Sequence, residues 1–250
     1  MNNWDYENEQ WTQLPYHLKH LPLFTRHFDL MSKFFRLLWA FFLKWNAFRW
    51  YIRLEVVGDL KQIQRNYPKL LVISNHSSHL DATSIAAAVP FSYWSHLYIA
   101  AAKDYFFSNA LFTFFSQHCL GAIPIDRKDK KGEAIQLCVN LLQKLDNIWL
   151  IIFPEGTRSP DGSIRNFKRG VSLFSEKSNS PLLFIYLEGN DRLWPKGNFF
   201  AKPGKLRLHV GPVHPPGPID LLYERYLEWA SKINPEIEKQ LREEFPNSDN

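Results

Sequence analysis

The sequence predicts an α/β fold, in which a mixed, mostly parallel β-sheet is flanked by helices in a single layered domain. From residue 53 onward, apolar runs of strand length alternate with stretches of helical periodicity. A chain of 250 residues with 45% hydrophobic residues is long enough to bury one sizeable core. We therefore expect an α/β domain at 53–250, ending in a helix, and an N-terminal lead-in and helical segment at 1–52.

The helical segment at 31–52 is rich in aromatic residues, which make up nine of its 22 positions. Its longest charge-free run, 37–43, is far shorter than the roughly 20 residues that span a bilayer. At helical spacing Lys33, Arg36 and Lys44 fall on one side, with Phe, Trp and Leu residues largely elsewhere. This pattern suits a helix lying in a membrane interface, and the alternative is a core-packing helix with solvated lysines.

The elements of the α/β domain follow from their apolar patterns and from the residues that end them. We expect strands at 54–58, 70–74, 97–101, 121–126, 148–153, 182–187 and 206–210. We expect helices at 82–89, 105–118, 131–146, 171–177 and 221–233, the last ending before Pro235. Because proline has no N–H to donate to a neighbouring strand, Pro124 suits an edge strand of the sheet or the end of a strand better than a central position.

The stretch Asn75–Asp81 joins the predicted strand 70–74 to the predicted helix 82–89. It delivers His76 at a strand end and Asp81 in the first turn of the next helix. Positions five apart on one continuous helix point roughly 140° away from each other, but across a turn the two side chains can meet. An aspartate so placed fixes the tautomer and orientation of a general-base histidine. We predict that His76 and Asp81 form a catalytic pair.

A second loop, Phe153–Ser159, directly follows another predicted strand. It combines backbone N–H groups, a hydroxyl, a glutamate and Arg158, and Lys168 and Arg169 follow at a predicted helix start. Arginine grips phosphate through two parallel hydrogen bonds, and a helix start adds positive potential. The loop is either a phosphate cradle or a solvated surface loop, and the basic stretch 125–131 leaves the same two alternatives.

These motifs resemble the glycerolipid acyltransferase family typified by 1-acyl-glycerol-3-phosphate acyltransferases. The resemblance covers about residues 50–215 and three motifs in order. The first motif, Asn-His-x4-Asp, and the arginine that ends the second are matched by Asn75, His76, Asp81 and Arg127. The third motif and the Phe-Lys-x-Gly after it are matched by Phe153–Ser159, Phe167, Lys168 and Gly170. Phe184 stands where the family usually has a proline.

The resemblance implies an O-acyltransferase that moves a fatty acyl group from a thioester donor, acyl-CoA or acyl carrier protein, to the hydroxyl of a lysophospholipid. The family's usual acceptor is 1-acyl-glycerol 3-phosphate. His76 would be the general base, oriented by Asp81, with no covalent acyl-enzyme, cofactor or metal. The residues implied in substrate binding are Arg127, Glu155, Gly156, Thr157, Arg158 and Lys168. The aromatic segment resembles the family's interfacial helices, so we expect a monotopic protein on the cytoplasmic face of a membrane.

Other functions remain open on the residues alone. The net charge of +5 and pI near 9.1 suit nucleic acid, anionic membranes or anionic substrates, but no nucleic-acid-binding motif is present. The spacing of His76, His79 and Asp81 superficially resembles a metal-ligand cluster, although no second cluster matches it and His79 also suits a polar turn. Within the family the acceptor could be another lyso-lipid or glycerol 3-phosphate. A non-enzymatic peripheral membrane protein is the remaining alternative.

Overall fold

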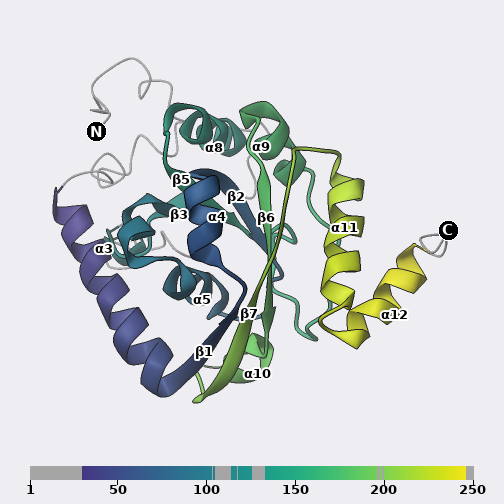
Figure 1. Cartoon of the computed structure of the whole chain (residues 1–250), viewed down its shortest axis with the longest axis horizontal. Helices are drawn as coiled ribbons and strands as arrows, with labels where there is room; N and C mark the ends of the chain where they lie inside the picture. The colour runs from purple at the N-terminus through teal and green to yellow at the C-terminus, as the bar shows by residue number, and fades with distance from the viewer. Residues whose placement is uncertain are drawn as a thin grey trace.

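A seven-stranded sheet forms the centre of the molecule, and helices cover both of its faces (Figure 1). This computed structural model describes residues 30–245 except 103, 105–113, 117, 126–132, 196, 197 and 199. The strands are β1 Ile52–Val57, β2 Lys69–Ser74, β3 Leu97–Ala102, β4 Ala122–Ile125, β5 Ile148–Ile152, β6 Leu182–Glu188 and β7 Gly204–His214.

The strand order is β1-β7-β6-β2-β5-β3-β4. In the described part of the chain, neighbouring strands run parallel except β6 and β7, which are antiparallel. The predicted mixed, mostly parallel sheet is therefore confirmed. The carboxyl ends of β2 to β6 lie along one edge of the sheet, where α/β proteins place their ligand sites.

The helices are α3 Leu30–Phe42, η2 Leu43–Tyr51, α4 Leu60–Asn66, α5 Asp81–Ala88, η3 Phe91–His96, α8 Glu133–Lys144, α9 Gly170–Ser178, α10 Asn190–Leu193, α11 Ile219–Ser231 and α12 Pro235–Glu244. One face of the sheet packs against α8, α9, α11 and α12, and the other against α3, η2, α4, α5 and η3. None of the helices among the described residues is both long and apolar enough to cross a bilayer.

The central strand β2 shows why its sequence is an unbroken apolar run. Leu71 and Ile73 pack under α8 and α11, whereas Leu70 and Val72 pack on the side of α5. Because successive side chains of a strand point to opposite faces, a strand covered on both faces must be apolar at every position.

Most of the predicted elements are confirmed, but the structure has further helices, including η3 and α10, that the sequence did not predict. The helix α4, capped by Asp59, which accepts from two backbone N–H groups, was not predicted. Pro235 begins a further helix, since proline is well suited to a helix's first position, and Asn234 caps it. The predicted helix 105–118 lies largely outside the described residues. Strand β4 lies at the sheet edge, as Pro124 indicated.

In the helical segment formed by α3 and η2, the side that carries Arg36 and Lys44 faces the protein interior. Arg36 is only 2% exposed, and its guanidinium donates to the carbonyls of Trp94 and Leu97. Lys44 Nζ donates to the carbonyl of Ala87 at 2.5 Å. The expected exposed basic face is therefore wrong for Arg36 and Lys44, because their cationic groups donate hydrogen bonds to backbone carbonyls at the ends of η3 and α5.

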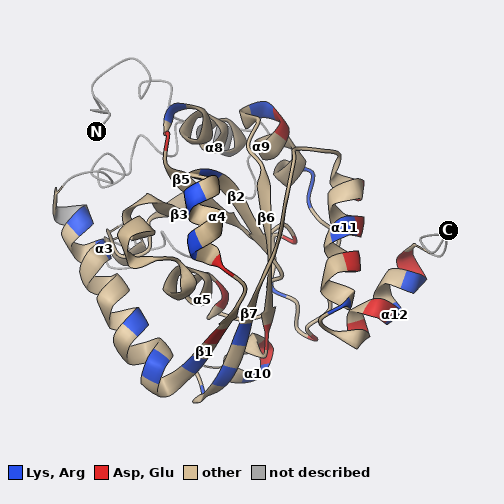
Figure 2. Cartoon of the chain, in the orientation of Figure 1, with Lys and Arg blue, Asp and Glu red and all other residues tan. Residues whose placement is uncertain are grey.

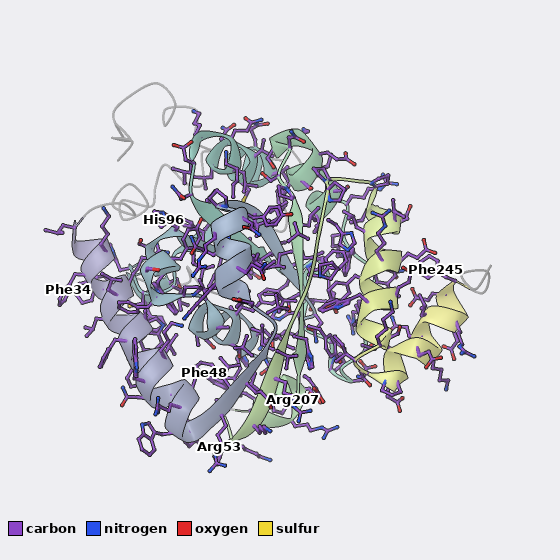
Figure 3. The ribbon with its side chains drawn as sticks, viewed as in Figure 1. Phe34, Phe48, Arg53, His96, Arg207 and Phe245 are labelled. Carbon is purple, nitrogen blue, oxygen red and sulfur yellow. The ribbon has the colours of Figure 1, made fainter. Side chains whose placement is uncertain are left out.

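The other side of the α3–η2 segment is exposed and apolar. Phe34 points away from the sheet and Phe48 toward it (Figure 3), and they are 62% and 6% exposed. The ribbon of α3 and η2 carries no acidic residue (Figure 2). The structure thus combines the two alternatives, with one side packed into the core and one side apolar and open. The division of the chain at residue 52 stays a prediction.

Candidate active site

The turn between β2 and α5 brings His76 and Asp81 together. His76 Nδ1 donates to Asp81 Oδ2 at 2.7 Å, and the His76 ring stacks on Phe153 with centroids 4.1 Å apart. The Asp81 side chain is completely buried, and 21% of the His76 side chain is exposed. The predicted pairing is confirmed. Because Nδ1 carries the proton that Asp81 accepts, Nε2 is the nitrogen that can take a proton from a substrate.

The backbone of this turn is held from several directions. The Asn75 side chain forms two hydrogen bonds with the backbone of Leu187 in β6, at 3.0 and 2.8 Å. The Asn75 N–H donates to the hydroxyl of Tyr226 in α11 at 2.9 Å. The carbonyl of His76 accepts from the N–H of Ser159 at 2.7 Å. These contacts explain the asparagine of the motif, whose amide extends the pairing of β2 with β6 beyond the strand end.

A cavity of about 350 Å³ opens beside the His76 ring. Its polar part comes from the turn after β2 and the loop after β5, and includes His76, Ser78, His79, Gly156, Thr157 and Arg158. Its apolar part comes mainly from β3, β4, β5 and α9, and includes Ile99, Ala100, Ala101, Ile125, Ile152 and Phe174. Asp104 adds one carboxylate. A site that joins a carboxylate-oriented imidazole to an apolar pocket suits a substrate with a polar head and a hydrocarbon chain.

The loop after β5 places Arg158 at this cavity. Arg158 Nη1 contacts Nε2 of His79, whose ring lies 5.1 Å from that of Trp194. Burial lowers the pKa of His79, and the positive charge of Arg158 lowers it further. A guanidinium is always a donor, so His79 Nε2 acts as the acceptor and the imidazole is neutral. His79, considered above as a metal ligand or a polar turn residue, is thus a neighbour of Arg158.

Glu155 joins the two loops and does not line the cavity. Its Oε1 accepts from the backbone N–H of His76 at 2.8 Å, and its Oε2 accepts from the N–H of Arg165 at 3.2 Å. The side chain is only 2% exposed. Its role in joining the loops is visible in these bonds, whereas its contact with substrate stays a prediction.

The Glu155 carboxyl gives the folded protein a specific pH dependence. Burial raises the pKa of Glu155 from its usual 4.5 to about 8, and the charge of Asp81 adds to the effect. Between these two values the folded state binds more protons than the unfolded state, so stability falls as the pH rises. Relative to Glu155→Gln, the wild-type free energy of unfolding is expected to decline between pH 4.5 and 8 by an amount on the order of a few kcal/mol.

Denaturant unfolding at a series of pH values measures this difference. Glu176→Gln, which changes an exposed carboxylate on α9, is the matched control and should follow the wild-type curve. Parallel pH curves for wild type and Glu155→Gln would show that Glu155 is ionised in the folded protein.

The remaining predicted site residues are placed as follows. Gly156 and Thr157 line the cavity, and Gly156 has a φ of +69°, a left-handed conformation that glycine adopts without strain. Lys168 is exposed, and its aliphatic chain lies over Gly156. Arg127 lies outside the described residues. Phe184 is fully buried against Tyr226 under α11 and does not line the cavity.

The family model described as Acyltransferase matches residues 54–192, which include both loops of the site. The chain belongs to the acyltransferase family. A relative from Limnanthes alba, named 1-acyl-sn-glycerol-3-phosphate acyltransferase, is 32% identical over 61% of this chain and 51% of its own length. One of the same name from Pseudomonas aeruginosa is 32% identical over 47% of this chain and 48% of its own length.

This acyltransferase-family chain thus spans about half the length of the relatives that it matches, and 41% of one from Brassica napus. The crystal structure of the 1-acyl-sn-glycerophosphate acyltransferase from Thermotoga maritima shares its fold. The TM-score is 0.65, with 23% sequence identity, and the match covers 92% of this chain and 91% of that one.

Several residues of the acyltransferase site were not found from the sequence. Among the described residues these include Tyr226, Trp194 and Asn190, each of which supports the His76 turn or its neighbours. They carry no local signal, since all lie far from the turn in sequence. No group of three or more His, Cys, Asp or Glu side chains in the described part of this acyltransferase-family chain is placed to hold a metal ion.

Proposed function

We propose that the chain transfers a fatty acyl group from a thioester donor to the free hydroxyl of a lysophospholipid, with 1-acyl-glycerol 3-phosphate as the acceptor. The observation that carries the proposal is the hydrogen-bonded pair of His76 and Asp81 at a cavity with an apolar wall and Arg158 at its polar part. The names of the relatives support the choice of acceptor. The thioester is acyl-CoA or acyl carrier protein, and the reaction uses no further cofactor.

In the proposed reaction the acceptor hydroxyl lies within hydrogen-bond reach of His76 Nε2. As the hydroxyl oxygen attacks the thioester carbonyl, Nε2 takes its proton, and the buried Asp81 carboxylate stabilises the imidazolium that forms. The tetrahedral intermediate collapses when the C–S bond breaks. His76 then returns the proton to the departing thiolate, so the enzyme ends in its starting state. The products are an ester and a free thiol.

The apolar part of the cavity is the proposed location of the fatty acyl chain. Ala100 and Ala101 are small, so space remains beside the ends of β3 and β5 where larger side chains would fill it. Burying a hydrocarbon chain is worth about 0.8 kcal/mol per CH₂ group. Binding energy from the chain and from the phosphate would orient the reacting hydroxyl and carbonyl.

Arg158 is the proposed phosphate ligand, because its guanidinium lies at the cavity and is oriented by His79. Arg158→Ala is expected to raise KM for the phosphorylated acceptor about 10- to 100-fold with a smaller effect on kcat, because a charge-assisted bond made throughout the reaction is lost. Steady-state kinetics with varied acceptor measure both constants.

Arg169→Ala is the matched control for Arg158. It removes an exposed arginine that follows the same loop and does not line the cavity. Its KM for the acceptor should stay within about twofold of wild type, as is usual for exposed charges. An unchanged KM in Arg158→Ala would remove Arg158 from the phosphate role.

The experiment that tests the function uses purified protein with acyl-CoA and acyl-acyl-carrier-protein as donors. The acceptors are 1-acyl-glycerol 3-phosphate, glycerol 3-phosphate and lysophospholipids with other head groups, and mass spectrometry identifies the products. Formation of phosphatidic acid is the expected result. If no acceptor is acylated with either donor, the proposal fails and a non-enzymatic membrane-binding role gains support.

We also propose that this chain lies monotopically on a membrane, at the cytoplasmic face, through the open side of α3 and η2. The exposed residues on this segment include Phe34, Leu38, Phe41, Trp45 and Trp50. Exposed apolar surface on this scale marks an interaction site, and Trp and Phe suit the level of the lipid headgroups. Arg49 and Arg53 (the latter labelled in Figure 3) are both exposed and adjacent in sequence to the Trp50 region, and they suit anionic headgroups.

A further inference from the structure

Asn190 contacts the buried carboxylate of Asp81 from a distant part of the chain. It follows β6 directly and begins the short helix α10, after Gly189, whose φ of +92° turns the chain sharply. Asn190 Nδ2 donates to Asp81 Oδ1 at 2.7 Å, although the two residues are 109 positions apart. Asn190 is completely buried, so water does not compete for this bond.

The two oxygens of Asp81 receive different donors. Oδ2 accepts from His76 Nδ1 and from the N–H groups of Ser77 and Ser78, at 2.7, 2.8 and 2.9 Å. Among the described residues, Asn190 is the donor at Oδ1. Hydrogen bonds at both oxygens fix the orientation of a buried carboxylate and compensate for its removal from water. The amide of Asn190 supplies the hydrogen bond to Oδ1 and adds no positive charge that would compete with His76 for the carboxylate.

The packing of Asn190 indicates that its amide has a role other than stabilising the fold. Its own Oδ1 is buried with no hydrogen-bond partner among the described residues. A buried unpaired carbonyl oxygen destabilises a protein, and an apolar residue of the same shape would avoid that cost. The orientation of the amide is unambiguous, because the flipped form would turn its oxygen toward Asp81 Oδ1, placing two acceptors face to face.

We propose that Asn190 is a positioning residue for acyl transfer, which holds the Asp81 carboxylate turned so that Oδ2 faces His76 Nδ1. This proposal rests on the proposed function, in which His76 is the general base. Without the amide donor, the Asp81 carboxylate is free to rotate, and the imidazolium that forms in the transition state loses its aligned partner. The effect therefore falls on kcat, whereas KM for acceptor and donor is conserved.

Two variants of nearly the same shape test the proposal. Asn190→Leu removes the donor and is expected to lower kcat about tenfold or more with KM unchanged. In Asn190→Asp the new carboxyl group donates to Asp81 only while it is protonated. Its kcat should therefore approach that of wild type at low pH and fall, relative to wild type, as the pH rises. Ser84→Ala is the control, because Ser84 Oγ accepts only a long 3.5 Å hydrogen bond from Asn190 Nδ2 and itself donates to the carbonyl of Leu80.

Steady-state kinetics across pH separate the outcomes, with thermal melting as the check on folding. If Asn190→Leu does not fold, the pH profile of Asn190→Asp decides alone. A kcat for Asn190→Leu within twofold of wild type, or a loss in Asn190→Asp that does not vary with pH, overturns the positioning role. His76→Ala distinguishes the two levels of inference, since an active His76→Ala refutes the proposed base, and an inactive one with unaffected Asn190 variants refutes only the role of Asn190.

Discussion

His76→Ala is expected to lower kcat for acyl transfer by about 10²–10⁴-fold, because it removes the base that takes the proton of the acceptor hydroxyl. The substitution should leave the fold intact. The turn is held through the backbone of His76, whose N–H donates to Glu155 and whose carbonyl accepts from Ser159, and alanine preserves both groups. KM should change little, since the lost interaction is made in the transition state.

His96→Ala is the matched control for His76. His96 ends η3, just before β3 begins, and so lies at the amino end of β3, whereas the site lies at the carboxyl ends of the parallel strands. Its substitution should leave kcat within about twofold, because His96 does not line the cavity. Initial rates by mass spectrometry of product measure both variants, and a fully active His76→Ala enzyme would contradict the general-base mechanism.

The parts of the site that the sequence predicted share one property. His76 and Arg158 each follow a run of apolar residues that reads as a strand, and parallel neighbouring strands bring their carboxyl ends to the same edge. The pairing of His76 with Asp81 also depends on local geometry alone, since a turn followed by a helix start determines it. Local patterns therefore sufficed for these residues.

The parts that the sequence did not predict depend on contacts between distant segments. Asn190 and Tyr226 reach the His76 turn from α10 and α11, and neither has a local pattern that distinguishes it from a core residue. Glu155 has the same limitation, because sequence alone does not show whether a carboxylate faces a ligand or a backbone N–H. Arg36 is the clearest case, because a cation at a helical position is usually solvated, whereas this one is buried over the Tyr98 ring.

The inward direction of Arg36 also decides how the membrane proposal should be tested. Deletion of residues 1–50 would remove Arg36 together with Ala40, Leu43 and Phe48, all of which are buried in the core. Loss of binding after such a deletion would report unfolding as readily as loss of a membrane contact. Substitutions on the open side avoid this ambiguity, because Phe34, Leu38 and Phe41 are each more than half exposed, at 62%, 53% and 53%.

The combined change Phe34→Glu, Leu38→Glu and Phe41→Glu is expected to lower the partition coefficient onto vesicles containing anionic lipid about 100-fold or more. Each apolar side chain is worth roughly 1.5–3 kcal/mol when it leaves water, and the added carboxylates are repelled by the anionic surface. Vesicle sedimentation measures the partition coefficient.

The control compares two single variants, Leu221→Glu and Phe41→Glu. Leu221 is an exposed leucine on α11, on the other face of the sheet. With a short-chain acceptor dispersed in detergent the triple variant should keep wild-type kcat, because none of the three side chains lines the cavity. Undiminished partitioning of the triple variant would place the membrane contact on another surface.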